Sequence, residues 1–332
     1  MRKARRLSPK AYIEGITSED RYILSQAISV IESNRKEDNE LSEEILAGIQ
    51  NHTGNAIRVG ITGVPGVGKS TFIETFGQEV IRNGHKLAVL TIDPSSQLSK
   101  GSILGDKTRM EELAMNPSAY IRPTASGKSL GGVASKTREV MLLCEAAGYD
   151  VVFIETVGVG QSETSVHGMV DFFLLLMLAG AGDELQGIKK GIMEMADAIA
   201  ITKADGDNIQ RAERAKAEYQ NALHLFPMAQ GGWIPKVKTT SALKKTGMTE
   251  VWHIITDYRQ KMIANGFWHH QRRAQNIDWM HSVIKDYLLK EFYDTVTIKK
   301  MLVQMEEQVA TEKIPATNAA KKLLSHFNDR NS

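Results

Sequence analysis

One segment, GVPGVGKST at Gly63 to Thr71, carries the most specific chemistry in the chain. It matches the pattern GxxxxGK[ST], in which glycines let backbone N–H groups wrap a phosphate chain at the start of a helix. Lys69 is expected to reach the β- and γ-phosphates, and the Ser70 hydroxyl is expected to bind Mg²⁺. The segment therefore predicts a nucleoside triphosphate site. Its residues are Gly63, Val64, Pro65, Gly66, Val67, Gly68, Lys69, Ser70 and Thr71.

Acidic residues after two apolar segments are candidate partners of this loop. Asp93 follows LTI, and Glu155 follows VVFI. Mg²⁺ beside phosphates takes carboxylates and water as further ligands, so an acid at the end of a neighbouring strand suits it. Asp106, in GSILGDKTRM at 101–110, could join them when that loop closes, although the segment would also suit a helix start with solvated charges. The predicted metal ligands are Ser70, Asp93, Asp106 and Glu155.

The choice of base is indicated by TKAD at 202–205. In sites of this type the aspartate, here Asp205, accepts two hydrogen bonds from guanine, and the stem of Lys203 packs on the ring. Adenine lacks this pair of donors, so the pattern favours GTP and GDP over ATP. The usual motif has Asn where this chain has Thr202, and we expect the loop to lose a contact with the phosphate loop. Ser241, Ala242 and Leu243 resemble the loop whose backbone contacts the guanine oxygen.

The elements that must hold these residues follow an alternating pattern. Apolar strand candidates are separated by segments long enough for crossover helices, which predicts an α/β fold with a doubly wound, mostly parallel sheet. In such a fold, ligands bind at the carboxyl ends of the strands. The strand candidates are residues 58–62, 87–93, 150–155, 172–179, 198–203 and 236–240.

Helical extensions are predicted on both sides of this core. Residues 7–50 are polar, with an apolar stripe formed by Tyr22, Ile23, Ala27, Ile28 and Ile31. Beyond about residue 261, apolar residues recur at helical steps, with helices expected around 277–292, 298–309 and 319–327. The predicted division is therefore an extension at 1–50, a nucleotide domain at 51–260 and a C-terminal extension at 261–332. The C-terminal helices could cap the core or carry an apolar face to a second subunit.

Composition excludes several classes of protein. The net charge of the 332 residues is only +2, so no broad basic field indicates nucleic-acid binding. The most hydrophobic run, 172–179, is far shorter than the roughly 20 residues of a membrane span. Cys144 is the only cysteine, which fits a reducing compartment. The basic start, residues 1–6, suits a solvated tail better than a transit peptide, so a cytoplasmic protein is expected.

Five motifs together resemble the ArgK/MeaB family of P-loop GTPases. They are GVPGVGKST, IDPSS at 92–96, GSILGDKTRM, ETVGVGQSE at 155–163 and AGAGDELQGIKKG at 179–191. The resemblance covers nearly the whole chain. It implies a GTPase that serves as a chaperone of adenosylcobalamin-dependent acyl-CoA mutases, chiefly methylmalonyl-CoA mutase. It also implies a homodimer built largely from the C-terminal helices.

The resemblance assigns roles to individual residues. Asp93, Asp106 and Glu155 would surround Mg²⁺ or its waters, and Gln161 would belong to a second switch. Residues 183–191 would form a third switch that senses the mutase, with Lys189 approaching the nucleotide in the complex. The implied catalytic set is Lys69, Glu155, Asp106 and Lys189.

Three functions follow as hypotheses. The leading one is a GTP-driven switch that gates cobalamin loading of the mutase and protects it, with slow intrinsic hydrolysis because no arginine finger lies in the phosphate loop. The second is an ATP-dependent kinase of a transport-binding protein, as an older label of the family suggests, although the guanine-type TKAD speaks against it. The third is a scaffold that binds nucleotide without useful hydrolysis.

Overall fold

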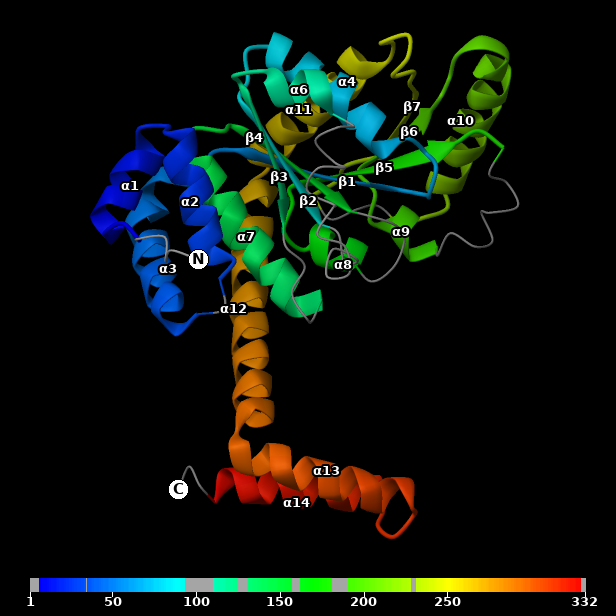
Figure 1. The fold of residues 1–332 in the computed structure, drawn as a ribbon. Coiled ribbons are helices and arrows are strands. Elements are labelled where there is room, and N and C mark those ends of the chain that lie inside the picture. Colours follow the sequence, from blue (N-terminus) through cyan, green and yellow to red (C-terminus); the bar gives the residue numbers. More distant parts are fainter. Residues whose placement is uncertain are drawn as a thin grey trace. The chain divides into compact units, whose positions relative to one another are not determined.

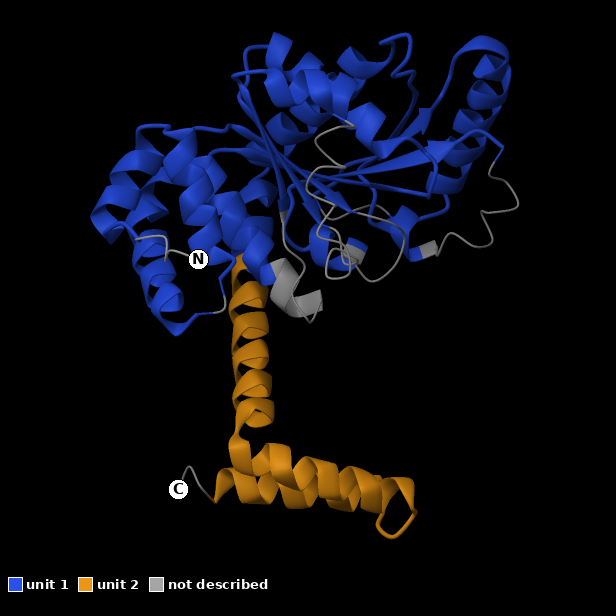
Figure 2. Cartoon of the chain, viewed as in Figure 1, with its two compact units in different colours: residues 1–275 blue, residues 276–332 orange. Residues whose placement is uncertain are grey.

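The computed structural model describes residues 6–33, 35–92, 110–124, 130–156, 162–180, 190–227 and 231–329. The chain forms two compact units, residues 1–275 and 276–332, which Figure 2 shows in different colours. The first unit contains the sheet and the predicted nucleotide-binding motifs. The second is helical.

A seven-stranded parallel sheet is the centre of the first unit (Figure 1), in the order β3-β2-β4-β1-β5-β6-β7. Every residue of β1, β2, β4 and β6 is buried, as expected for parallel strands covered by helices on both faces. The predicted α/β fold is confirmed. The strands are β1 (Ile57–Gly63), β2 (Leu87–Ile92), β3 (Ala119–Thr124), β4 (Val151–Thr156), β5 (Phe172–Leu178), β6 (Ala198–Thr202) and β7 (Lys236–Thr239).

Strand β3 was not among the predicted strands. It pairs only with β2 in the described sheet, from Leu87 opposite Ala119 to Ile92 opposite Thr124. Pro123 lies within it and lacks a backbone N–H, which confines such a strand to an edge. Because Arg122 and Pro123 interrupt the apolar run, the sequence has no pattern of a buried strand at this place. The other six strands lie where they were predicted, with ends shifted by at most one residue.

The first three helices lie within residues 9–49, the segment for which a helical extension is predicted, and they belong to the first compact unit. Helix α2 begins after Asp20, whose carboxylate accepts the backbone N–H groups of Tyr22 and Ile23. The buried stripe of α2 contains Leu24, Ala27, Ile28, Val30 and Ile31, whereas Tyr22 is 70% exposed. Including Tyr22 in the stripe was therefore wrong, because Tyr22 lies on the face of α2 opposite Ala27 and Ile31, whereas Ile23 packs against the core.

The helices and short 3-10 turns complete the set of described elements. They are α1 (Pro9–Thr17), α2 (Arg21–Ile31), α3 (Lys36–Ile49), η1 (Gln50–His52), α4 (Lys69–Arg82), α6 (Glu111–Met115), α7 (Leu130–Ala146), α8 (Ser162–His167), α9 (Lys190–Glu194), η3 (Gly206–Asn208), α10 (Ile209–Leu223), α11 (Met248–Ala264), α12 (Phe267–Asp294), α13 (Val296–Ala310) and α14 (Ala316–Asn328).

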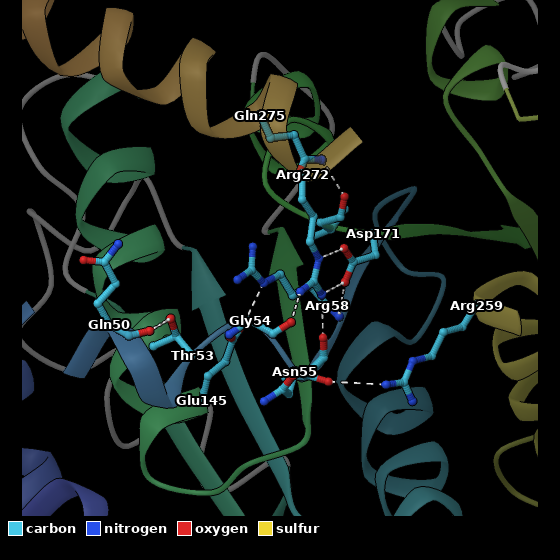
Figure 3. Close-up of polar contacts among 12 residues, drawn as sticks. Gln50, Thr53, Gly54, Asn55, Arg58, Glu145, Asp171, Arg259, Arg272 and Gln275 are labelled. Carbon is cyan, nitrogen blue, oxygen red and sulfur yellow. Dashed lines mark hydrogen bonds and ion pairs between the residues drawn. The ribbon is translucent and has the colours of Figure 1, made fainter. Parts of the chain in front are cut away.

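A buried ionic network lies at the amino ends of β1 and β5 (Figure 3). The guanidinium of Arg58 donates to Glu145 at 2.6 Å, and the backbone N–H of Arg58 donates to Asp171 at 2.8 Å. Arg272 of α12 donates to both oxygens of Asp171, at 2.6 Å each, and also to the carbonyl of Gly54. One arginine thus fixes the first turns of α12 to the start of two central strands.

The second unit contains residues 276–294 of α12 together with α13 and α14. Phe292 and Phe327 form an edge-on ring contact with centroids 5.3 Å apart, and Ile298, Ala319 and Leu323 are buried. The three predicted C-terminal helices are therefore present. Several apolar side chains of α12 remain exposed, among them Ile277, Met280, Ile284, Tyr287 and Leu288.

Candidate functional site

The phosphate loop connects β1 to α4 and depends on glycine at three positions. Gly66 and Gly68 have φ angles of 78° and 88°, in the region that residues with a side chain rarely adopt. A Cβ on Gly63 would lie 2.5 Å from the carbonyl oxygen of Leu176, so that position admits no side chain without a shift of the backbone. The backbone of the loop therefore requires the glycines of the sequence motif.

Lys69, the first residue of α4, bends back over this loop. Its Nζ donates to the carbonyl oxygen of Gly63 at 3.0 Å. Burial lowers the pKa of Lys69, while the carboxylates of Glu155 and Glu163 act in the opposite direction. A partly desolvated ammonium at a helix start is suited to interact with a negatively charged phosphate chain.

Ser70 and Glu155 meet beside the loop. The Ser70 hydroxyl donates to a carboxylate oxygen of Glu155 at 3.5 Å, and Glu155 is only 5% exposed. Both are oxygen donors of the type that Mg²⁺ prefers, and a nucleotide-bound Mg²⁺ needs only one or two protein ligands besides phosphate and water. The residues present therefore fit a magnesium ion, although in the described part of the chain no group of three or more His, Cys, Asp or Glu side chains is arranged to hold a metal.

Thr202 and Lys203 connect the predicted base-recognition segment to the phosphate loop. The Thr202 hydroxyl donates to the carbonyl of Val67 at 2.9 Å, and the Nζ of Lys203 donates to the carbonyl of Gly66 at 2.9 Å. The expectation that Thr202 would lose this contact was wrong. Because Thr202 is the last residue of β6 and lies directly against the loop, a short hydroxyl reaches the carbonyl.

Asp205 and the segment 241–243 come together on the same side of the loop. The Ser241 hydroxyl donates to the carboxylate of Asp205, and its oxygen accepts the backbone N–H of Lys244 at 3.1 Å. The carbonyl of Ala242 accepts the hydroxyl of Thr75 on α4 at 3.4 Å, whereas Leu243 is 77% exposed. Segments predicted from separate motifs thus lie together at the carboxyl edge of the sheet.

Some predicted residues lie outside the described part of the chain. These are Asp93, Asp106, Gln161, Lys189 and the rest of the segment 181–189. The structure also adds Glu163, which is fully buried at the start of α8 and acts on the pKa of Lys69. Glu163 ends the motif ETVGVGQSE, but no role was predicted for it, because its effect on Lys69 depends on how α8 packs.

Comparison with known proteins identifies the family. The model described as "Methylmalonyl Co-A mutase-associated GTPase MeaB" matches residues 24–297. The chain belongs to the MeaB family. It is 48% identical to "GTPase ArgK" of Escherichia coli, over 82% of this chain and 83% of that protein. It is 43% identical to "Methylmalonic aciduria type A homolog, mitochondrial" of Mus musculus, over 95% and 79% respectively.

A solved structure supports this assignment along nearly the full length. "Crystal structure of LAO/AO transport system kinase" is 37% identical, with a TM-score of 0.77, and covers 98% of this chain and 99% of that one. As a member of the MeaB family, the protein is a P-loop GTPase and binds guanine nucleotides. Among its described helices, none combines the length and apolarity needed to cross a membrane.

Proposed function

We propose that this MeaB-family GTPase is a nucleotide-switched chaperone of an adenosylcobalamin-dependent acyl-CoA mutase, with methylmalonyl-CoA mutase as the first candidate. The family match carries this proposal, because the description of the family names that mutase. The name of the mouse relative refers to methylmalonic aciduria, which is consistent with the same partnership. In this role the protein would gate cobalamin loading, protect the mutase and act in the cytoplasm.

Each part of the site has a role in this proposal. Asp205 accepts the two donors of guanine, the stem of Lys203 packs on the ring, and the backbone of 241–243 contacts the guanine oxygen. Lys69 interacts with the phosphates. Ser70 and Glu155, with Asp93 and Asp106, hold Mg²⁺, which when bound neutralises charge on the β- and γ-phosphates.

The switch depends on differential binding. GTP and GDP can change the affinity for the mutase only if the mutase prefers the conformation that one of the two nucleotides stabilises. We assign this response to Gln161 and to residues 183–191, with Lys189 approaching the nucleotide in the complex. The phosphate loop contains no arginine, so intrinsic hydrolysis is slow and rises when the partner supplies the missing contacts.

The test is GTP hydrolysis with and without purified methylmalonyl-CoA mutase. A faster rate with the mutase supports the proposal, and equal rates contradict it. Lys69→Ala distinguishes the scaffold hypothesis, since this substitution should abolish nucleotide affinity. A scaffold would still bind the mutase equally well, whereas a switch would lose the dependence of binding on GTP.

A protein kinase is the second candidate, because the solved structure with a TM-score of 0.77 is described as a transport system kinase. A kinase should transfer the γ-phosphate to a transport-binding protein and should prefer ATP. Asp205 opposes this function, since its carboxylate suits guanine and not adenine. Incubation of candidate partners with γ-labelled ATP and GTP would reveal a phosphoprotein if the kinase hypothesis were correct.

We also propose that the protein is a homodimer formed through its C-terminal helices. Ile277, Met280, Ile284, Tyr287 and Leu288 recur at helical steps along α12 and are between 46% and 67% exposed in the single chain. A contiguous apolar stripe of this kind is typical of a helix that packs against another protein surface.

A further inference from the structure

Two buried hydroxyls connect β1, which leads into the phosphate loop, with β4, which carries Glu155. Thr156 donates from Oγ1 to Oγ1 of Thr62 over 2.7 Å, and both residues are 0% exposed. Thr62 directly precedes Gly63, the first residue of the phosphate loop. Thr156 directly follows Glu155. The bond therefore lies next to the phosphate loop and next to Glu155, the two places that hold the proposed magnesium ligands.

The position of this bond in the sheet is informative. In the described sheet, the register between β1 and β4 runs from Ile57 opposite Val151 to Ile61 opposite Glu155 and ends there. At the next position the two threonines are not paired with each other in the main-chain ladder. Thr62 is opposite Leu175 of β5, and Thr156 is opposite Ile92 of β2. The hydroxyl bond thus continues the connection between β1 and β4 beyond the end of their main-chain ladder.

We propose that the Thr62–Thr156 pair is a positioning clamp for the magnesium site. The clamp fixes the separation between the end of β1, which leads to Ser70, and the end of β4, which carries Glu155. The 3.5 Å contact between the Ser70 hydroxyl and the Glu155 carboxylate depends on this separation. The inference rests on the proposed function of Ser70 and Glu155 as magnesium ligands.

Valine substitutions at one or both threonines distinguish a positioning role from a role in stability alone. Replacing one threonine by valine leaves a buried hydroxyl without its partner, which lowers stability whether or not the bond positions Glu155. Replacing both by valine keeps the shape and removes both polar groups, which is close to neutral for stability. The double variant therefore loses the clamp while the protein stays folded.

The experiment uses the full chain with T62V, T156V and T62V/T156V, together with T156S as the conservative variant. T137V is the matched control, because Thr137 is equally buried but lies in α7. Release of a fluorescent GDP analogue is measured over a series of Mg²⁺ concentrations, and thermal unfolding is measured in parallel. The same Mg²⁺ series is then repeated for GTP hydrolysis.

The double variant is expected to need about fivefold more Mg²⁺ for half-maximal slowing of GDP release, the equivalent of one neutral hydrogen bond. Its GDP release without Mg²⁺ and its melting temperature should stay close to wild type, and T156S and T137V should follow the wild-type Mg²⁺ curve. A wild-type curve that shows no response to Mg²⁺ would overturn the proposed magnesium site and the clamp with it. A magnesium response in wild type that the double variant reproduces would overturn the clamp alone.

Discussion

At the scale of single residues, Thr202 shows how one hydroxyl can connect two motifs. Thr202→Val should weaken binding of both GTP and GDP about fivefold, because the carbonyl of Val67 loses a buried hydrogen bond that helps to set the shape of the phosphate loop. Thr202→Ser keeps the hydroxyl and should bind almost as wild type. Fluorescence titration with labelled GDP and GTP measures the effect.

A matched control for this prediction is Thr239→Val, which removes the hydroxyl that donates to Glu213 on the exposed side of β7. That variant should keep wild-type affinity. Equal affinities of Thr202→Val and Thr239→Val would show that the contact with Val67 does not support nucleotide binding.

Residues of this site also show which contacts the sequence alone can predict and which it cannot. Lys69, Ser70 and Asp205 could be predicted because their chemistry follows from residue type and from spacing within a local motif. The contact of Thr202 with Val67 and the bond between Thr62 and Thr156 could not. These bonds join residues 135 and 94 positions apart, and they exist only because the sheet brings the strand ends together.

At the scale of elements, the attachment of the first turns of α12 to the sheet depends on Arg272. Its side chain is 11% exposed and makes a bidentate ion pair with Asp171, besides bonds to two backbone carbonyls. Arg272→Met should lower the free energy of unfolding by about 3–5 kcal/mol, because the buried carboxylate of Asp171 loses its ion-pair partner and keeps, among the described residues, only the backbone N–H of Arg58. The neighbouring Arg273 is exposed and bonds to a carbonyl of its own helix, so Arg273→Met should change stability by less than about 0.5 kcal/mol. Urea unfolding of the two variants tests this difference, and similar losses would contradict it.

Helix α8 leads to a prediction about pH. His167 packs edge-on against Phe173, with ring centroids 5.6 Å apart, and burial lowers the pKa of His167 below its usual 6.5. In the folded protein the ring therefore stays neutral down to a lower pH than in the unfolded chain, so the free energy of unfolding falls as the pH drops below about 6.5. His167→Leu should make that fall smaller.

The measurement is urea unfolding at about pH 7.5 and pH 5.5. His224→Leu is the control, since His224 is exposed, and it should keep the wild-type difference between the two pH values. If His167→Leu kept the full difference as well, burial of His167 would not be a source of the pH dependence.

The elements also differ in how well sequence predicts them. Strand β5 was recognisable because FFLLLML is apolar throughout, as a strand buried on both faces requires. Strand β3 was not, because AYIRPT is held at the sheet edge by its pairing with β2 and not by its own apolar pattern. The apolar stripe of α2 was identified but extended to Tyr22, which lies on the opposite, exposed face of the helix.

At the scale of the whole molecule, nucleotide binding and association are expected to be separable. Every described residue of the nucleotide site lies in the first unit, whereas the apolar stripe from Ile277 to Leu288 lies in the second. A change confined to the stripe should therefore alter the oligomeric state without altering the affinity for GDP.

Ile284→Glu tests this separation, because a buried, unpaired carboxylate in an apolar interface is costly enough to prevent association. We expect the wild-type protein to sediment as a dimer and the variant as a monomer, with equal affinity for labelled GDP. Ser282→Glu is the matched control, since it adds the same charge to α12 two residues away, on the side of the helix opposite the stripe. It should stay dimeric. A variant Ile284→Glu that still sediments as a dimer would show that the subunits meet elsewhere, and a monomeric wild type would show that this stripe serves another partner.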